Sequence, residues 1–274
     1  MPVDHHLHFL QKNSKICSNI LYDYLETGKK RGVEFFGFSE HAYLFKEAER
    51  INFNPWQQKR MIYSLQDDYL KALSKLKQEN KNILIGLEID YHPKKEKEIK
   101  AFIQACKKNY DFDFFSGSVH WIKNWGIDLD EKLYAQKMNK QSQSKYFKKY
   151  FSLIEKLIDS GLFDFVCHLD LIKLFDITPL DQVYFKKIIK ALKKFRLGVE
   201  INTNGMNRPI KETFPSLDLV RILKKNQIPL TLSSDAHTAF RVGEYFSNCL
   251  RELKKNGYKK LFYCKKFKYE FIEI

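Results

Sequence analysis

The strongest constraint on the fold is a regular alternation of apolar, β-prone segments with amphipathic helical patterns. We expect seven strands, at residues 3–8, 34–39, 83–90, 114–119, 163–168, 198–202 and 229–233. Helical patterns lie between and after them, at about 16–30, 57–79, 95–107, 131–159, 180–195, 217–225 and 240–255. Strands that alternate with helices pair in parallel, so the sequence predicts an α/β protein.

Polar clusters at the expected strand ends favour a distorted, TIM-like (β/α)7 barrel over a doubly wound open sheet. An open sheet gathers its site near one switch point, whereas the rim of a barrel unites the carboxyl ends of all strands. The 274 residues contain no Gly/Ser-rich linker. We therefore expect one domain over residues 1–274, with an extended tail at about 260–274 that forms a hairpin or an added edge strand.

Composition limits the classes of partner and the compartment. The net charge is +15, with 48 basic residues, of which only eight are arginines. Lysines occur in nearly every expected helix. This distribution predicts a solvated surface and no nucleic-acid face. No apolar run is long enough to span a bilayer, and no signal peptide is recognisable. Five scattered cysteines without a C-x-x-C motif predict reduced thiols in the cytoplasm.

Histidines and carboxylates gather where the strands are expected to end. In the N-terminal segment, Asp4, His6 and His8 would share one face of a strand, since side chains alternate along it. The later clusters are Ser39-Glu40-His41, Glu88-Ile89-Asp90, Val119-His120, His168-Leu169-Asp170, Glu200–Gly205 and Ser233–His237. Taken singly, a buried histidine is more often a hydrogen-bonded interior residue than a ligand. Together, however, these clusters hold six of the eight histidines.

Imidazoles and carboxylates that converge on one rim are costly to bury unless a cation binds them. A mixed shell of this kind suits zinc, iron or manganese. Six imidazoles together with Glu88 and Asp235 exceed the needs of one ion. The sequence therefore predicts two to three divalent metal ions, with zinc favoured and manganese or iron as alternatives.

Seven motifs resemble those of the polymerase-and-histidinol-phosphatase (PHP) superfamily. They are the D-x-H-x-H start, S-E-H, G-L-E-I-D-Y, G-S-V-H-W, C-H-L-D, E-I-N-T-N-G and S-D-A-H, from Asp4 to about Tyr245. Within the superfamily, the chain resembles the monofunctional histidinol-phosphate phosphatases of bacterial histidine biosynthesis. This resemblance implies a distorted (β/α)7 barrel, the PHP fold, with a trinuclear metal centre.

The resemblance also implies which residues hold each ion. The first ion would be bound by His6, His8, Glu88 and Asp235, with Glu88 bridging to the second. The second ion would take His120 and His168, and the third His41 and His237. One departure concerns the third site, where much of the family has a further histidine or aspartate soon after the H-x-H pair. This chain has no such ligand over residues 9–15. Glu40 is a substitute, or the third ion binds weakly or only together with substrate phosphate.

The activity implied by the resemblance is hydrolysis of L-histidinol phosphate by a hydroxide that bridges two ions. Glu88, Asp235 and His237 are the expected catalytic residues. Arg208 is the first candidate for a phosphate clamp and Arg241 the second, because a guanidinium matches phosphate geometry. The general acid stays open among Glu40, Asp235 and a metal-bound water.

Aromatic and acidic side chains on the rim loops are candidates for recognising the imidazole and amine of histidinol. They are Trp121, Trp125, Asp128 and Asp170, although loop packing and solvation explain each of them equally well. Two other functions remain open: a PHP-type phosphodiesterase or exonuclease, and a non-enzymatic, metal-binding polymerase-accessory module. We expect a small phosphomonoester as partner, with no membrane and no nucleic acid, whereas the oligomeric state cannot be read from the sequence.

Overall fold

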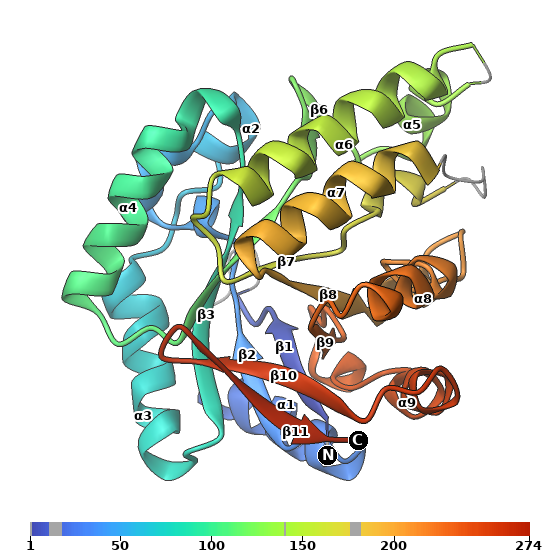
Figure 1. Ribbon diagram of the computed structural model, residues 1–274. Helices are drawn as coiled ribbons and strands as arrows, with labels where there is room; N and C mark the ends of the chain where they lie inside the picture. The colour runs from blue at the N-terminus through green and yellow to red at the C-terminus, as the bar shows by residue number, and fades with distance from the viewer. Residues whose placement is uncertain (1, 11–17, 140, 176–181) are drawn as a thin grey trace.

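A computed structural model describes residues 2–10, 18–139, 141–175 and 182–274. Parallel strands form a nearly closed barrel, and helices cover its outside (Figure 1). The sheet order is β1-β2-β3-β4-β7-β8-β9. These strands are β1 (Val3–Leu7), β2 (Phe35–Phe38), β3 (Ile83–Asp90), β4 (Phe114–Ser118), β7 (Phe165–Val166), β8 (Gly198–Asn202) and β9 (Leu230–Ser233). The distorted (β/α)7 barrel predicted from the sequence is therefore confirmed.

The two ends of the sheet meet at the carboxyl end of β1. Leu7 forms a parallel bridge with Ala236, just past β9. The backbone N–H of Ala236 donates to the His6 carbonyl at 3.2 Å, and the N–H of His8 donates to the Ala236 carbonyl at 2.9 Å. These bonds exclude the doubly wound open sheet, in which the outer strands stay apart.

The helices pack their apolar faces against the outside of the barrel. The longer ones are α1 (Ser18–Lys30), α3 (Lys71–Glu79), α4 (Glu96–Asn109), α6 (Gln143–Asp159), α7 (Gln182–Phe195), α8 (Leu217–Lys225) and α9 (Phe246–Lys255), and the short ones are α2 (Pro55–Gln58) and α5 (Glu131–Lys137). In α6, Tyr150, Ile154 and Leu157 are fully buried, as residues at three- and four-residue spacing on one face should be.

Three of the predicted helices are interrupted or shorter than expected. The pattern at 57–79 divides into α2, a π-helical turn Leu65–Leu70 and α3, because Ser64 caps a new start by accepting the N–H of Asp67. The pattern at 131–159 breaks where Asn139 Oδ1 accepts the N–H groups of Gln141 and Ser142. The third begins at Phe246, after a separate 3₁₀ turn at Ala239–Arg241.

The amino half of the barrel interior is filled by apolar and aromatic side chains. Fully buried members of this cluster include Val3, Leu84, Phe114, Phe165 and Phe262. Polar side chains that enter the barrel at its carboxyl end therefore pack on a close-packed apolar layer, which shields them from bulk water.

The C-terminal residues form an antiparallel hairpin of β10 (Lys260–Lys265) and β11 (Lys268–Glu273). Phe262 and Cys264 on β10 are fully buried and belong to the apolar cluster in the amino half of the barrel. The hairpin crosses in front of β1 and β2 in Figure 1, close to both chain termini. It therefore covers the end of the barrel opposite the carboxyl rim.

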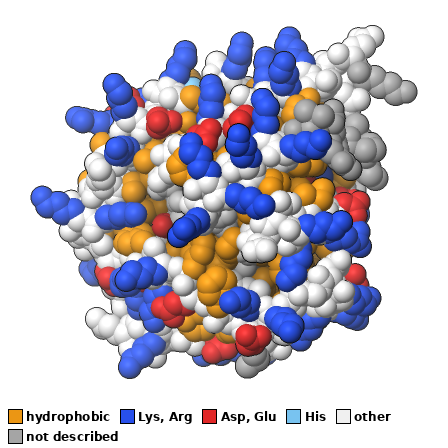
Figure 2. Space-filling model, viewed as in Figure 1, with side chains coloured by type: hydrophobic (Ala, Val, Ile, Leu, Met, Phe, Trp, Pro, Cys, Tyr) orange, Lys and Arg blue, Asp and Glu red, His pale blue; other side chains and the backbone are white. Residues whose placement is uncertain are grey.

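A further pair of short strands, β5 (Trp121–Ile122) and β6 (Trp125–Gly126), forms a small hairpin after β4. On the surface, lysine and arginine side chains are spread over the whole face visible in Figure 2. Cys106, Cys167, Cys249 and Cys264 are buried and free. No helix in the described part of the chain is long and apolar enough to cross a membrane.

Candidate metal centre

Glu88 lies at the centre of the carboxyl rim, surrounded by five imidazoles from four other segments. Its carboxylate is buried at the end of β3, and both oxygens face histidine nitrogens. The contacts of Oε2 are His41 Nδ1 at 2.7 Å, His6 Nε2 at 3.2 Å and His8 Nε2 at 3.8 Å; those of Oε1 are His168 Nε2 at 3.0 Å and His120 Nε2 at 3.5 Å. The side chains predicted from scattered motifs are therefore brought together.

Asp235 supplies a second carboxylate at the closing seam of the barrel. Its Oδ1 lies 3.4 Å from His8 Nε2 and 3.5 Å from His237 Nδ1. The amides of Asn202 and Asn204 donate to Oδ2 at 3.2 and 3.3 Å. One oxygen is thus held by the β8 segment, while the other faces the imidazoles.

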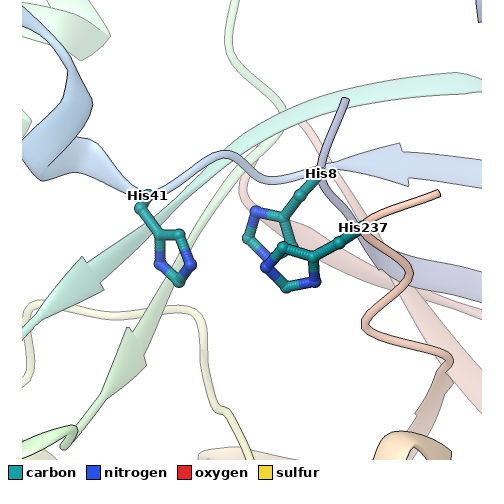
Figure 3. Close-up of side chains that lie close together, drawn as sticks. All are labelled: His8, His41 and His237. Atoms are coloured by element: carbon teal, nitrogen blue, oxygen red, sulfur yellow. The ribbon is translucent and has the colours of Figure 1, made fainter. Parts of the chain in front are cut away.

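Donor atoms gather in groups in which all atoms lie within 4.8 Å of one another. The groups are His6–His8–Asp235, His41–Glu88–His120, His8–His41–His237 and His6–Cys167–Glu200. Figure 3 shows the third of these, with the imidazoles of His8, His41 and His237 gathered from three separate segments. The first group contains three of the four donors that the resemblance assigned to the first ion, without Glu88, and the third contains both donors assigned to the third ion. His8 belongs to both groups.

Several buried atoms in this cluster have no hydrogen-bond partner. His6 Nε2, His8 Nε2 and Glu88 Oε2 are among them, and they face one another across the distances given above. Buried polar groups are normally satisfied, so unsatisfied imidazole and carboxylate atoms that converge require a further partner. A divalent cation fits this donor set, because neutral imidazole and carboxylate are common ligands of zinc, iron and manganese.

Carboxylates behind the imidazoles fix the direction in which the rings point. Glu200 Oε1 lies 2.7 Å from His6 Nδ1, and Asp90 Oδ1 lies 2.6 Å from His120 Nδ1. Gln57 in turn donates to Asp90 Oδ2 at 2.8 Å. Each pair directs the Nε2 atom of the ring toward Glu88, as in metal sites where a carboxylate orients a histidine ligand.

These orienting contacts were not found from the sequence. Glu200 is 194 residues away from His6, and the sequence placed it in a polar cluster at a strand end without assigning it a partner. Asp90 belongs to the cluster Glu88-Ile89-Asp90 at an expected strand end, and the sequence assigned it no role. A carboxylate two residues after a predicted ligand on the same strand face, as Asp90 is after Glu88, was the one local signal that could have identified it.

Glu40 lies just after β2, and its side chain contacts the first residues of the loop after β1. Its Oε1 accepts the backbone N–H groups of Phe9 and Leu10 at 2.5 and 2.6 Å, and its Oε2 lies 3.4 Å from His8 Nδ1. It belongs to none of the donor groups found among the described residues. Glu40 therefore positions His8. Of the stretch predicted to lack a third-site ligand, residues 11–15 lie outside the described residues.

The electrostatics of the cluster show what a cation would replace. Burial lowers the pKa of the His8 and His120 imidazoles, but the carboxylates outweigh it: Asp235 and Glu40 raise the pKa of His8 to about 9, and Asp90 and Glu88 raise that of His120 to about 10. Burial raises the pKa of Glu88, but the imidazoles of His41 and His120 hold it well below its usual range. Without metal, protonated imidazoles would therefore balance the charge of the carboxylates, and binding of a divalent ion must displace the protons from those imidazoles.

The two arginines predicted to bind phosphate lie on rim loops. Arg208 follows the 3₁₀ turn Thr203–Asn207 after β8, and Arg241 ends the turn after β9, with its guanidinium 5.6 Å from the Phe240 ring centre. Among the described residues, neither guanidinium forms a hydrogen bond or ion pair with the histidine–carboxylate cluster. Their role in phosphate binding stays a prediction.

The candidates for histidinol recognition differ in their surroundings. Trp121 and Trp125 are buried in the β5–β6 hairpin, and the ring centres of Trp121 and Trp56 lie 5.4 Å apart. Asp170 is fully buried, 3.2 Å from Lys173 Nζ, and accepts the N–H of Ser216. Asp170 is therefore part of an internal ion pair, whereas the half-buried Asp128 lies close enough to contribute to the raised pKa of His120.

A family model described as "PHP domain" matches residues 4–204 of this chain. A probable histidinol-phosphatase of Deinococcus radiodurans is 29% identical over 260 residues, which cover 93% of each chain. A histidinol-phosphatase of Bacillus subtilis is 26% identical over 245 residues, covering 82% of this chain and 90% of the relative.

Solved structures agree on the fold. The crystal structure of histidinol phosphate phosphatase from Lactococcus lactis, complexed with zinc, L-histidinol and phosphate, superposes with a TM-score of 0.74 and 22% identity. The match covers 98% of both chains. A structure from Listeria monocytogenes, described there as a histidinol phosphatase, gives a TM-score of 0.73 at 20% identity.

Proposed function

Because the chain belongs to the PHP domain family, we propose that it is a metal-dependent histidinol-phosphatase that converts L-histidinol phosphate to L-histidinol and phosphate. The observation that carries the proposal is the convergence of five imidazoles on the two oxygens of Glu88. The names of the relatives, which match over nearly the whole chain, support the substrate. Four buried, free cysteines among the described residues support the cytoplasm as its location.

Two to three divalent ions, zinc first among them, fit the donor groups. We assign His6, His8, Glu88 and Asp235 to one ion, His120 and His168 with the second oxygen of Glu88 to another, and His41 and His237 to a third. Bound ions would lower the pKa of water and offset charge on the phosphoryl oxygens. Zinc in the structure of the Lactococcus lactis enzyme supports the choice of metal.

The residues around the donors prepare the site for a phosphate monoester. Glu200 and Asp90 hold the imidazoles of His6 and His120 in one orientation, so that no reorganisation is needed during the reaction. Asp235 stays ionised near neutral pH: burial raises its pKa, but nearby imidazoles, above all His6 and His8, hold the pKa well below its usual range. Its Oδ1, which faces His8 and His237 while Oδ2 is held by two amides, is the oxygen that would hold an ion.

His237 is the most accessible histidine of the cluster, with 54% of its side chain exposed. The groups packed around its ring, together with the positive charge of His8, lower the pKa of its imidazole to about 4, so the ring is neutral and can accept a proton. We assign Arg208 to the non-bridging phosphate oxygens and Arg241 as the alternative. The Arg208 loop continues from β8, which carries the orienting Glu200, and Arg241 follows Asp235 and His237.

The decisive experiment is a substrate panel on one preparation of known metal content. Phosphate release from L-histidinol phosphate is compared with that from a nucleoside monophosphate and a sugar phosphate, and cleavage of a short oligonucleotide is followed in parallel. We expect L-histidinol phosphate to have the highest kcat/KM. Faster cleavage of the oligonucleotide would favour the phosphodiesterase alternative, and the absence of all hydrolysis from metal-replete protein would favour the non-enzymatic one.

A further inference from the structure

A lysine-lined groove lies outside the barrel, between the β5–β6 hairpin and the helices α5 and α6, which are neighbours at the top of Figure 1. Its volume is about 530 Å³. The lining residues are Ile122, Lys123, Asn124, Trp125, Leu133, Lys137, Lys145, Tyr146 and Lys149. The groove contains none of the metal-centre donors, so it is a separate site.

The charge of this groove is unbalanced. Four of its lining residues are lysines, and none of its described lining residues is acidic. No ion pair links Lys123, Lys137, Lys145 or Lys149 to a carboxylate within the described ranges. On other helices of the chain, lysines do pair with acids, as Lys255 does with Glu252 at 2.8 Å. Like charges drawn together from three segments repel one another unless an anion lies among them.

Two of the lysines are partly withdrawn from solvent. Lys137 and Lys149 are half-buried, and their ammonium groups lie 5.9 and 5.5 Å from the centre of the Tyr146 ring. Trp125 is 4% exposed, and its Nε1 is a buried donor without a hydrogen-bond partner in the described structure. The groove therefore presents ammonium groups at two depths, with Lys137 and Lys149 half-buried and Lys123 and Lys145 exposed, and no acidic side chain lies among its described lining residues.

We propose that this groove binds an oligophosphate, either free or as the phosphate tail of a nucleotide. Lysine binds phosphate as a compact point charge, and four of them balance an anion that carries three to four negative charges. The volume suits a small multivalent ligand of this size. A single orthophosphate could reach only some of the four ammonium groups, so affinity rises with the number of phosphates. This site is independent of the proposed phosphatase activity.

The test compares two double variants of equal charge and spacing. Lys145→Gln/Lys149→Gln removes two groove lysines on α6, and Lys186→Gln/Lys190→Gln removes two lysines four residues apart on α7. The metal-loaded protein is titrated with inorganic triphosphate, ATP and AMP by calorimetry and by tryptophan fluorescence, since Trp125 lines the groove. Excess Mg²⁺ prevents the ligands from stripping the bound ions, and a fixed background of orthophosphate occupies the phosphate-binding part of the metal centre.

We expect triphosphate and ATP to bind the parent with similar affinity and AMP at least tenfold more weakly. The α6 variant should lose at least tenfold in triphosphate affinity and the α7 variant less than threefold, with unchanged melting temperatures. A separate Lys123→Gln variant should weaken binding from the hairpin side. Equal losses in both double variants, or no binding of triphosphate by the parent, would overturn the proposal. Tighter binding of a short oligonucleotide, equally weakened by both variants, would instead indicate a diffuse polyanion surface.

Discussion

His5 Nε2 accepts the backbone N–H of Cys264 at 2.9 Å, so that the first strand is joined to the C-terminal hairpin. A backbone N–H can only donate, so Nε2 carries no proton and the imidazole is neutral. Nδ1 therefore donates to Thr231 Oγ1, which lies 2.6 Å away. The ring lies among Phe114, Phe165 and Phe262, and this burial, reinforced by the neighbouring His6, lowers the pKa of His5 to about 3.

We expect this histidine to make the metal-free fold sensitive to acid. Between its ordinary pKa of 6.5 and the lowered value of about 3, the unfolded chain binds a proton at His5 that the folded chain does not. The contribution of the neutral His5 ring to the free energy of unfolding is therefore complete above pH 6.5. It is lost as the pH falls, so the free energy of unfolding is lower by roughly 2 kcal/mol at pH 5. Urea unfolding of parent and His5→Gln at pH 7 and pH 5 measures the difference. An identical pH dependence in both proteins would show that His5 is protonated in the fold.

The sequence predicted the framework of this site because strand ends and ligands coincide. His6, His8, His41, His120 and His168 follow apolar strand segments, and parallel strands bring their carboxyl ends to one rim. The orienting pair of Glu200 and His6 could not be predicted, because it joins β8 to β1 across 194 residues and depends on how the barrel closes. The four groove lysines likewise lie on three separate segments of the sequence. Their proximity could not be predicted, because it depends on how the hairpin packs on α6.

Glu88→Gln should abolish turnover and leave the fold intact. Both carboxylate oxygens face imidazoles, and an amide offers one weaker oxygen donor in place of two charged ones. We expect a loss of more than a hundredfold in kcat, together with fewer bound ions per chain. Kinetics and elemental analysis on the same sample measure both. Glu252→Gln, on the outer helix α9 away from the metal centre, is the matched control. Activity within about tenfold of the parent, or roughly 1.4 kcal/mol of barrier, would contradict a bridging role.

Glu200→Gln should weaken metal binding without removing a ligand atom of the main cluster. The Glu200 carboxylate fixes the ring of His6 through a contact of 2.7 Å, and an amide can form one neutral hydrogen bond there at most. Loss of such an orienting partner typically lowers metal affinity by about ten- to a hundredfold. Competition with a chromogenic chelator gives the affinity directly. Unchanged affinity would assign Glu200 to packing alone.

One ion should leave before the others. The third donor group of His8, His41 and His237 contains no carboxylate, and His237 is 54% exposed. Stepwise dialysis against a mild chelator, with metal content and activity measured at each step, should remove one ion per chain while part of the activity remains. His237→Ala should reproduce that partly depleted state without dialysis. Simultaneous loss of all ions would mean that the sites bind as one unit.

Arg208→Ala tests the assignment of the phosphate clamp. A monoester presents a dianion, to which a guanidinium adds two charge-assisted hydrogen bonds, whereas a diester carries one negative charge and gains less. We expect kcat/KM for L-histidinol phosphate to fall by the equivalent of roughly 2–3 kcal/mol. Metal content should not change, because Arg208 is not a ligand, and any diesterase side activity should barely change. Arg251→Ala, on the outer helix α9, controls for loss of positive charge. Equal losses on both substrate types, or none on the monoester, would transfer the assignment to Arg241, where Arg241→Ala should then show the monoester-specific loss.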